Sequence, residues 1–212
     1  IRIERKVVPM RTIVFNGRSV RPSKVLCVGK NYVDHIEEMN SVPSDLMTLF
    51  MKPNASITDE LLSYRGEPLH FEGEICLLIE HNRVAGIGFG LDLTKRATQA
   101  ALKAAGLPWE RSKAFEGAAL FSPFVVAPAS LESIVLELSI DGALRQRGGT
   151  QHMLYPPSVI LKEVQTFLPL EDGDIIMTGT PAGVGPIEKG ATFTGRILDG
   201  EREVVSAQWI AH

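Results

Sequence analysis

The sequence of 212 residues contains only two cysteines, Cys27 and Cys76, and both lie in apolar stretches. Two thiols in a chain of this length cannot form a disulfide framework, so we expect both to be small core residues. No apolar run approaches the roughly 18 residues that a membrane-spanning helix needs. These absences predict a cytoplasmic protein, kept in a reducing compartment, without a membrane partner.

The sequence also lacks a large excess of positive or negative charge. The formal net charge is −3, and the 22 basic and 25 acidic residues are scattered without a long run of either sign. Because nucleic-acid binding needs a basic patch, we do not expect a nucleic acid as partner. Residues 1–9 are basic but lack the apolar segment of a signal peptide, so we expect an upstream extension with Met10 as the natural start.

Hydrophobic residues make up 44% of the chain, which is enough for a substantial core. Short apolar or β-branched runs predict strands, and they lie at residues 12–15, 24–28, 49–52, 74–79, 84–93, 175–177, 191–198 and 203–210. Helices are expected at residues 32–39, 94–105 and 156–168. Strands outnumber helices and do not alternate with them, which indicates an α+β fold. We expect one domain over residues 24–212, preceded over residues 1–23 by an extension and a hairpin with its turn at Asn16-Gly17.

Two local patterns carry expectations about packing. Glycine at positions 86, 88 and 90 leaves one face of a strand without side chains, which lets another backbone or a ligand come close. The helix at residues 94–105 has an alanine stripe that we expect to be its buried face. Its members are Ala97, Ala100, Ala101, Ala104 and Ala105.

Three carboxylates are candidate metal ligands. Glu72 and Glu74 are two residues apart at the start of an apolar strand, so their side chains point to the same face. Asp92 is flanked by leucines after the glycine-rich strand. Like charges beside apolar surface repel each other unless a cation compensates them, and oxygen ligands suit Mg²⁺ or Mn²⁺. The alternatives are an exposed strand start for the two glutamates and a helix cap for Asp92.

His35 and Glu38 are three residues apart on the first expected helix and therefore face the same side. A carboxylate raises the basicity of a histidine and fixes its orientation, which suits a general base that deprotonates water. The polar loop over residues 40–46 could open and close over such a site. The alternative is a solvated helix face.

Residues 178–185 follow a strand and are rich in glycine, so their backbone N–H groups could bind an anion. This segment lacks the Gly-Lys-Ser/Thr ending of a nucleotide phosphate loop, and the glycines at 86, 88 and 90 do not fit the dinucleotide pattern. We therefore do not expect nucleotide binding. Lys113 considered alone is typical of a solvent-exposed lysine.

Seven segments together resemble the fumarylacetoacetate hydrolase family, from about Val25 to Leu198. They are Val-Gly-Lys-Asn-Tyr-Val-Asp-His (28–35), Phe-Met-Lys-Pro (50–53), His-Phe-Glu-Gly-Glu (70–74), Leu-Asp-Leu-Thr-Lys-Arg (91–96), Gly-Leu-Pro-Trp (106–109), Ser-Lys-Ala-Phe (112–115) and Thr-Gly-Thr-Pro-Ala-Gly-Val-Gly (178–185). Each segment alone is weak evidence for this family, but their shared order and spacing identify the chain as a member of it.

The resemblance implies a mixed β-roll with a few short peripheral helices, a homodimer, and Mg²⁺ or Mn²⁺ held by Glu72, Glu74 and Asp92. It assigns catalytic roles to the lid pair His35 and Glu38 and to Lys113 and Gln99, and substrate binding to Lys30, Arg96 and Thr180. Many relatives have arginine where this chain has Lys30. A point charge there replaces a bidentate fork, which leaves the carboxylate selectivity open.

The function expected from this resemblance is metal-dependent cleavage of small 2-oxo acids. An acylpyruvate would be hydrolysed by water that the His35–Glu38 pair activates, or oxaloacetate would be decarboxylated, in both cases through a metal-stabilised pyruvate enolate. The alternatives are an isomerase or tautomerase of a related 2-oxo acid and a non-catalytic metal-binding module. The physiological substrate and the choice of Mg²⁺ over Mn²⁺ are left open.

Overall fold

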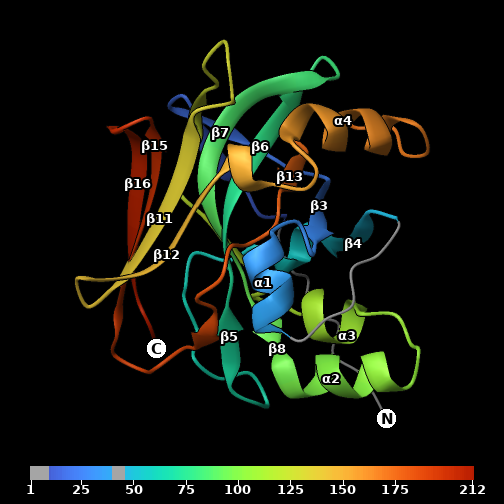
Figure 1. Ribbon diagram of the computed structural model, residues 1–212, viewed down its shortest axis with the longest axis vertical. Helices are drawn as coiled ribbons and strands as arrows, with labels where there is room; N and C mark the ends of the chain where they lie inside the picture. The colour runs from blue at the N-terminus through green and yellow to red at the C-terminus, as the bar shows by residue number, and fades with distance from the viewer. Residues whose placement is uncertain (1–9, 40–45) are drawn as a thin grey trace.

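The computed structural model describes residues 10–39 and 46–212, which form curled β-sheets with four short α-helices at their periphery (Figure 1). The expectations for residues 1–9 and for most of the loop over residues 40–46 lie outside the described residues. Cys27 and Cys76 are both free and buried, as expected. No helix in the described ranges is long and apolar enough to cross a membrane.

The largest sheet has seven strands in the order β10-β7-β6-β13-β3-β4, with β9 paired to β7. Their bounds are Lys24–Gly29 (β3), Thr48–Pro53 (β4), Gly73–Glu80 (β6), Arg83–Asp92 (β7), Ala119–Phe121 (β9), Val125–Val126 (β10) and Ile175–Met177 (β13). Only β13 and β3 pair in parallel within this sheet as described. The continuous apolar run of β6 takes a central position, because both faces of that strand are buried.

A second sheet of four antiparallel strands stands beside the first, in the order β12-β11-β15-β16 (Figure 1). Its strands are Ile134–Ile140 (β11), Ala143–Gly149 (β12), Thr192–Asp199 (β15) and Arg202–Ile210 (β16). The main core lies between the two sheets. There Phe89 of β7 packs directly against the backbone of Gly195, where an added Cβ would lie 2.3 Å from the ring.

The remaining strands of the described residues form two small sheets. One contains Gly185–Pro186 (β14), Leu69–Phe71 (β5) and Thr94–Lys95 (β8), and the other is the hairpin of Ile13–Phe15 (β1) and Arg18–Val20 (β2). The turn predicted at Asn16-Gly17 is confirmed, but it joins β1 to β2, a strand that the sequence reading missed. The strands β11 and β12 were also missed, although Asp141-Gly142 between them is a similar turn signal.

The four α-helices are Val33–Glu38 (α1), Arg96–Ala104 (α2), Glu110–Lys113 (α3) and Pro157–Gln165 (α4). The expected start of α2 at Thr94 was wrong, because Thr94 and Lys95 pair with β5 as a strand. The expectation for its buried face was also wrong. The alanine stripe is exposed, and α2 buries Gln99 and Leu102, since the packing of the helix against α3 and β8 decides which face is covered.

The expected close approach of another backbone to the glycine face of β7 is found at Gly86, where an added Cβ would meet the Val125 carbonyl as well as Phe15. Side chains cover the rest of this face: an added Cβ would meet Phe124 at Gly88, and Cys76 and Phe121 at Gly90. These phenylalanines belong to or pack against a second, smaller core cluster that also contains Cys76. Glu74 lies two residues before Cys76 on the same face of β6, so this cluster packs next to the site described below.

Candidate active site

Three buried carboxylates form the centre of the site. Glu72 lies between β5 and β6, Glu74 is in β6, and Asp92 ends β7. The Asp92 backbone N–H donates to the Glu72 carbonyl at 2.8 Å, which fixes the two chain segments side by side. One oxygen from each carboxylate lies within 4.8 Å of the others, and the residues are 6%, 1% and 0% exposed. The alternative of an exposed strand start is therefore wrong.

Lys113 of α3 neutralises two of these carboxylates. Its Nζ lies 2.8 Å from Glu72 Oε2 and 2.7 Å from Asp92 Oδ2, and it is 2% exposed rather than the solvent residue that its type suggests. Burial alone would raise the pKa of Glu72, but the charges of Lys113, Arg96 and His35 outweigh it and hold that pKa well below its ordinary value. The same pairing outweighs burial at Lys113 and raises the pKa of its ammonium.

Glu74 has a different environment. It forms no ion pair with any described residue, and its Oε2 accepts a hydrogen bond from the Gly179 N–H at 2.6 Å. Burial raises the pKa of Glu74 well above its ordinary value, and the neighbouring Asp92 and Glu72 raise it further. A buried carboxylate in this state is stabilised by an additional cation.

Lys52 of β4 is a site residue that the sequence reading did not single out. Its side chain is fully buried, and its Nζ lies 2.7 Å from Asp92 Oδ1 and donates to the backbone carbonyls of Leu93 and Lys113. The signal was present in the sequence, because Lys52 stands inside an apolar strand within the quoted Phe-Met-Lys-Pro segment. Buried lysines are rare unless they are paired.

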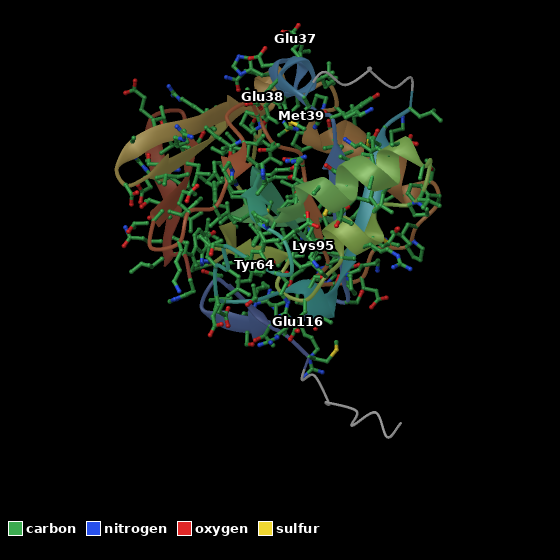
Figure 2. The ribbon with its side chains drawn as sticks, turned by 90° about the horizontal axis from the view of Figure 1, so that it is seen from below. Glu37, Glu38, Met39, Tyr64, Lys95 and Glu116 are labelled. Carbon is green, nitrogen blue, oxygen red and sulfur yellow. The ribbon has the colours of Figure 1, made fainter. Side chains whose placement is uncertain are left out.

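His35 and Glu38 form the pair that their spacing predicts. His35 Nδ1 lies 3.3 Å from Glu38 Oε2, and Glu38 also accepts a hydrogen bond from the Gly183 N–H at 3.0 Å. His35 is 8% exposed, so the alternative of a solvated helix face does not apply to it. Figure 2 shows Glu38 next to Met39 at the end of α1.

The segment over residues 178–185 does bind anions through its backbone, as expected, but the partners are carboxylates of the protein. Gly179 binds Glu74, and Gly183 binds Glu38. The buried Asn31 fastens this segment to the start of α1, since its Nδ2 donates to the Thr178 carbonyl at 2.8 Å. One segment therefore positions both a candidate metal ligand and the histidine's partner.

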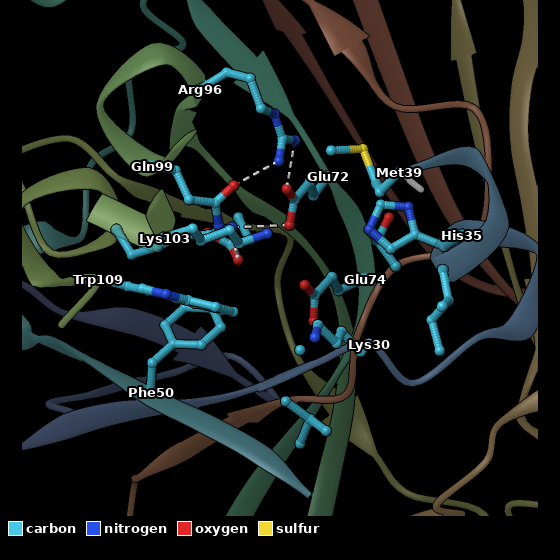
Figure 3. A pocket seen from close by; sticks show the side chains of 16 residues that line it. Lys30, His35, Met39, Phe50, Glu72, Glu74, Arg96, Gln99, Lys103 and Trp109 are labelled. Atoms are coloured by element: carbon cyan, nitrogen blue, oxygen red, sulfur yellow. Dashed lines mark hydrogen bonds and ion pairs between the residues drawn. The ribbon is translucent and has the colours of Figure 1, made fainter. Parts of the chain in front are cut away.

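A small cavity that is partly open to solvent joins these groups (Figure 3). Nine of the ten residues predicted for the site line it: Lys30, His35, Glu72, Glu74, Asp92, Arg96, Gln99, Lys113 and Thr180. Glu38 is the tenth and reaches the cavity through His35. Within the wall, Arg96 binds Glu72 Oε1 and Gln99 Oε1, each at 2.7 Å.

The cavity wall also contains residues that the sequence reading missed, namely Val28, Gly29, Ile36, Met39, Phe50, Lys103 and Trp109. Lys103 could have been found from spacing. It follows Arg96 by seven residues and Gln99 by four, which places the three side chains on one face of a helix.

Residues 24–208 match the family described as fumarylacetoacetate (FAA) hydrolase C-terminal. The chain belongs to the fumarylacetoacetate hydrolase family. This confirms the family resemblance and the expected α+β roll fold, and it places the chain in a family of enzymes.

Several known members of the family are similar over most of their length. An oxaloacetate tautomerase of Escherichia coli (strain K12) is 37% identical over 198 residues, which cover 83% of this chain and 90% of that protein. The crystal structure of fumarylpyruvate hydrolase from Pseudomonas aeruginosa in complex with Mn²⁺ and pyruvate superposes with a TM-score of 0.84 at 28% identity, covering 97% and 98% of the two chains. A 5-carboxymethyl-2-hydroxymuconate delta-isomerase from Mycobacterium smegmatis has a TM-score of 0.75 at 28% identity, with 91% and 80% covered.

Proposed function

We propose that this protein is a divalent-metal-dependent enzyme that interconverts the keto and enol forms of oxaloacetate. The observation that carries the proposal is the His35–Glu38 pair, which shares one cavity with three buried carboxylates. The names of the family relatives, including the E. coli oxaloacetate tautomerase, support this choice of reaction. With this proposal, the isomerase or tautomerase alternative takes precedence over the cleavage reactions expected from the sequence.

The donor set fits a hard divalent cation. Glu72, Glu74 and Asp92 would hold it, because their oxygens lie within 4.8 Å of one another and Mg²⁺ and Mn²⁺ prefer oxygen ligands. Glu74 in particular lacks a cationic partner among the described residues, and burial together with the charges of Asp92 and Glu72 raises its pKa. A cation bound there would supply Lewis acidity to the 2-oxo group of the substrate.

His35 would move the proton in this reaction. Because Glu38 engages Nδ1, the other ring nitrogen, Nε2, is the atom that can take a proton from C3 of oxaloacetate and return it to oxygen. Lys30, Arg96, Gln99 and Thr180 line the same cavity and would bind and orient the substrate's oxygens. Lys113 would stabilise negative charge beside Glu72 and Asp92.

Carbon–carbon bond cleavage is the second candidate. The structure of a fumarylpyruvate hydrolase with Mn²⁺ and pyruvate, similar over nearly the whole chain, favours it. In this case His35 would take a proton from water instead of from C3, and the same cavity would serve an acylpyruvate. The metal-binding module without activity is disfavoured because the cavity holds a candidate base together with the carboxylates.

The two reactions differ in their products. Purified protein with Mg²⁺ or Mn²⁺ is given oxaloacetate, and enol absorbance and released pyruvate are followed together. We expect the enol to equilibrate faster than in buffer without a matching release of pyruvate. Pyruvate formed at the same rate would favour the cleavage candidate, and no acceleration with either metal would contradict the proposal.

His35→Ala tests the proposed base, with His152→Ala as the matched control because His152 is exposed and lies outside the cavity lining. Loss of a positioned base lowers kcat by about 10²–10⁴-fold. We expect that loss for His35→Ala and an unchanged kcat for the control. Full activity of His35→Ala would show that another group moves the proton.

A further inference from the structure

Lys103 is a cation of the cavity wall that binds none of the described carboxylates. It lies in the last turn of α2, and its Nζ lies 4.9 Å from the centroid of the Trp109 ring. No ion pair or hydrogen bond from its ammonium group to a described residue is present, so the ring face is its partner. Figure 3 shows Lys103 beside Gln99 and over Trp109, inside the same cavity as Glu72.

The charges around Lys103 are mainly of its own sign. The Lys103 side chain is exposed, but partial burial still lowers the pKa of its ammonium. The nearby Arg96, Lys30 and Lys113 lower this pKa further, whereas Glu72 acts in the opposite direction. Arg96 and Lys113 are themselves bound to Glu72. An anion entering the cavity would therefore find Lys103 without a carboxylate partner to displace.

The cavity as a whole favours a ligand with more than one negative charge. Among its lining residues are the four cations Lys30, Arg96, Lys103 and Lys113 and the three carboxylates Glu72, Glu74 and Asp92. A divalent cation on the carboxylates, as proposed above, would increase the positive excess. Unlike charges within a few ångströms attract strongly in a partly buried site, so a second anionic group on the substrate would be stabilised.

We propose that Lys103, held over Trp109, binds the distal carboxylate of a dicarboxylic 2-oxo acid and so selects dicarboxylates over monocarboxylates. This rests on the proposed function, since it assumes that the 2-oxo group lies at Glu72, Glu74 and Asp92. Phe50 completes the aromatic wall, because its ring centroid lies 5.8 Å from that of Trp109. A lysine held against an aromatic ring, as Lys103 is against Trp109, loses less freedom on binding a ligand, which favours affinity.

The test compares two 2-oxo acids that differ in the distal carboxylate, 2-oxoglutarate and 2-oxobutyrate, by calorimetric titration in the presence of Mg²⁺. The variants are Lys103→Met, Lys103→Arg and the control Lys95→Met. Lys95 has the same kind of contact, with its Nζ 4.9 Å from the Phe115 ring centroid, but it does not line the cavity. Figure 2 shows Lys95 well apart from Glu38 and Met39 at the end of α1.

Loss of one charge-assisted hydrogen bond weakens binding by about tenfold or more. We expect Lys103→Met to raise the Kd for 2-oxoglutarate by that factor and to leave the Kd for 2-oxobutyrate within about twofold of the wild-type value. Lys103→Arg should restore most of the preference, and Lys95→Met should behave like the wild type. With oxaloacetate as substrate, Lys103→Met should raise KM more than it lowers kcat.

Equal weakening of both 2-oxo acids, or no weakening of either, would overturn the role of Lys103. The proposed reaction can be wrong independently of the role of Lys103. If the wild type binds both acids but does not act on oxaloacetate, the reaction is wrong while the titrations still decide the role of Lys103. If the wild type binds neither acid, the role of Lys103 is wrong, while the oxaloacetate assay still decides the reaction.

Discussion

At the scale of single residues, Glu74 is a buried carboxylate that lacks a cationic partner among the described residues. Burial raises its pKa above the ordinary value, so between these two pKa values the metal-free folded protein binds a proton that the unfolded chain releases. Stability from this group is therefore present at acidic pH and lost as the pH rises from the ordinary value through the raised value. Glu74→Gln should remove this loss, because the amide carries no charge.

We expect metal-free Glu74→Gln to be more stable than the metal-free wild type at neutral pH by about 1 kcal/mol, or about 2–4 °C in Tm. The difference should shrink as the pH falls from the raised pKa of Glu74 towards the ordinary carboxyl value of 4.5, and should stay small below it. Thermal unfolding across pH measures it, with the exposed Glu188→Gln as control. A difference that does not vary with pH would contradict the assignment.

A second prediction at this scale concerns Lys52. It is fully buried and lies 2.7 Å from Asp92 Oδ1, so Lys52→Met leaves one buried negative charge less well compensated. Removal of one partner of a buried ion pair costs about 3–5 kcal/mol, whereas an exposed pair contributes about 0–1 kcal/mol. Because Lys113 still neutralises Asp92, we expect a loss near the lower end, about 3 kcal/mol.

Urea denaturation measures this loss, and Arg18→Met is the matched control. Arg18 pairs with Glu80 at 2.5 Å, but its side chain is 56% exposed. The control should lose no more than about 1 kcal/mol. Equal losses in the two variants would show that burial does not determine the contribution of Lys52.

At the scale of elements, the hairpin between β6 and β7 has a turn that its residues suit only partly. His81 and Asn82 both have positive φ, 52° and 59°, where a two-residue hairpin turn favours Asn-Gly. Their side chains are exposed. The turn contributes backbone groups to its hydrogen bonds: the His81 N–H donates to Asp172 Oδ1, and the Asn82 carbonyl accepts from Gln165 Nε2. The double variant His81→Asn/Asn82→Gly should therefore gain about 0.5–1 kcal/mol, measured as a higher Tm.

The turn of the β1–β2 hairpin, in contrast, already has glycine at a position with positive φ. Gly17 has a φ of 77°, so Gly17→Ala should lose about 1–2 kcal/mol from the left-handed conformation, although no atom crowds the added methyl group. A lower Tm for the β6–β7 double variant, or no loss for Gly17→Ala, would mean that turn geometry does not limit stability here.

The elements show where sequence reasoning works and where it fails. The run over residues 74–79 predicts β6 because an apolar, β-branched stretch of this length suits a buried strand, and β6 spans Gly73–Glu80. The alanine stripe of α2 fails because alanine is compatible with both buried and exposed positions. Gln99 and Leu102 are the buried residues of this helix, and Gln99 lines the cavity.

At the scale of the whole molecule, a divalent cation should stabilise the fold. A ligand present at a hundred times its Kd adds about 2.7 kcal/mol, which for a chain of this size is about 5–10 °C in Tm. Thermal unfolding with Mg²⁺ or Mn²⁺, and again with EDTA, measures the gain. Asp92→Asn should lose it, and the exposed Glu188→Gln should keep it. An unchanged Tm for the wild type would contradict the metal site.

The homodimer expected from the family remains a prediction. Several large apolar side chains are exposed in the described part of a single chain, including Phe167 at 58% and Ile210 at 57%. Association of two chains could cover such surface. Analytical ultracentrifugation should give twice the chain mass of 23.2 kDa, and a monomer at all concentrations would contradict this expectation.

The sequence by itself determined the local relations. Glu72 and Glu74 point the same way because side chains two residues apart share a face in extended chain, and His35 meets Glu38 because a helix brings residues three apart together. These relations depend only on backbone geometry over a few residues.

Only the tertiary structure decided which distant groups meet. Pairing of β6 with β7 brings Asp92 beside Glu72. Packing of α3 and β4 buries Lys113 against both carboxylates and Lys52 against Asp92. It also filled the glycine face of β7 with phenylalanines and left the alanines of α2 exposed. The physical reason is that such contacts follow from burial summed over whole sheets, which no short segment of the sequence contains.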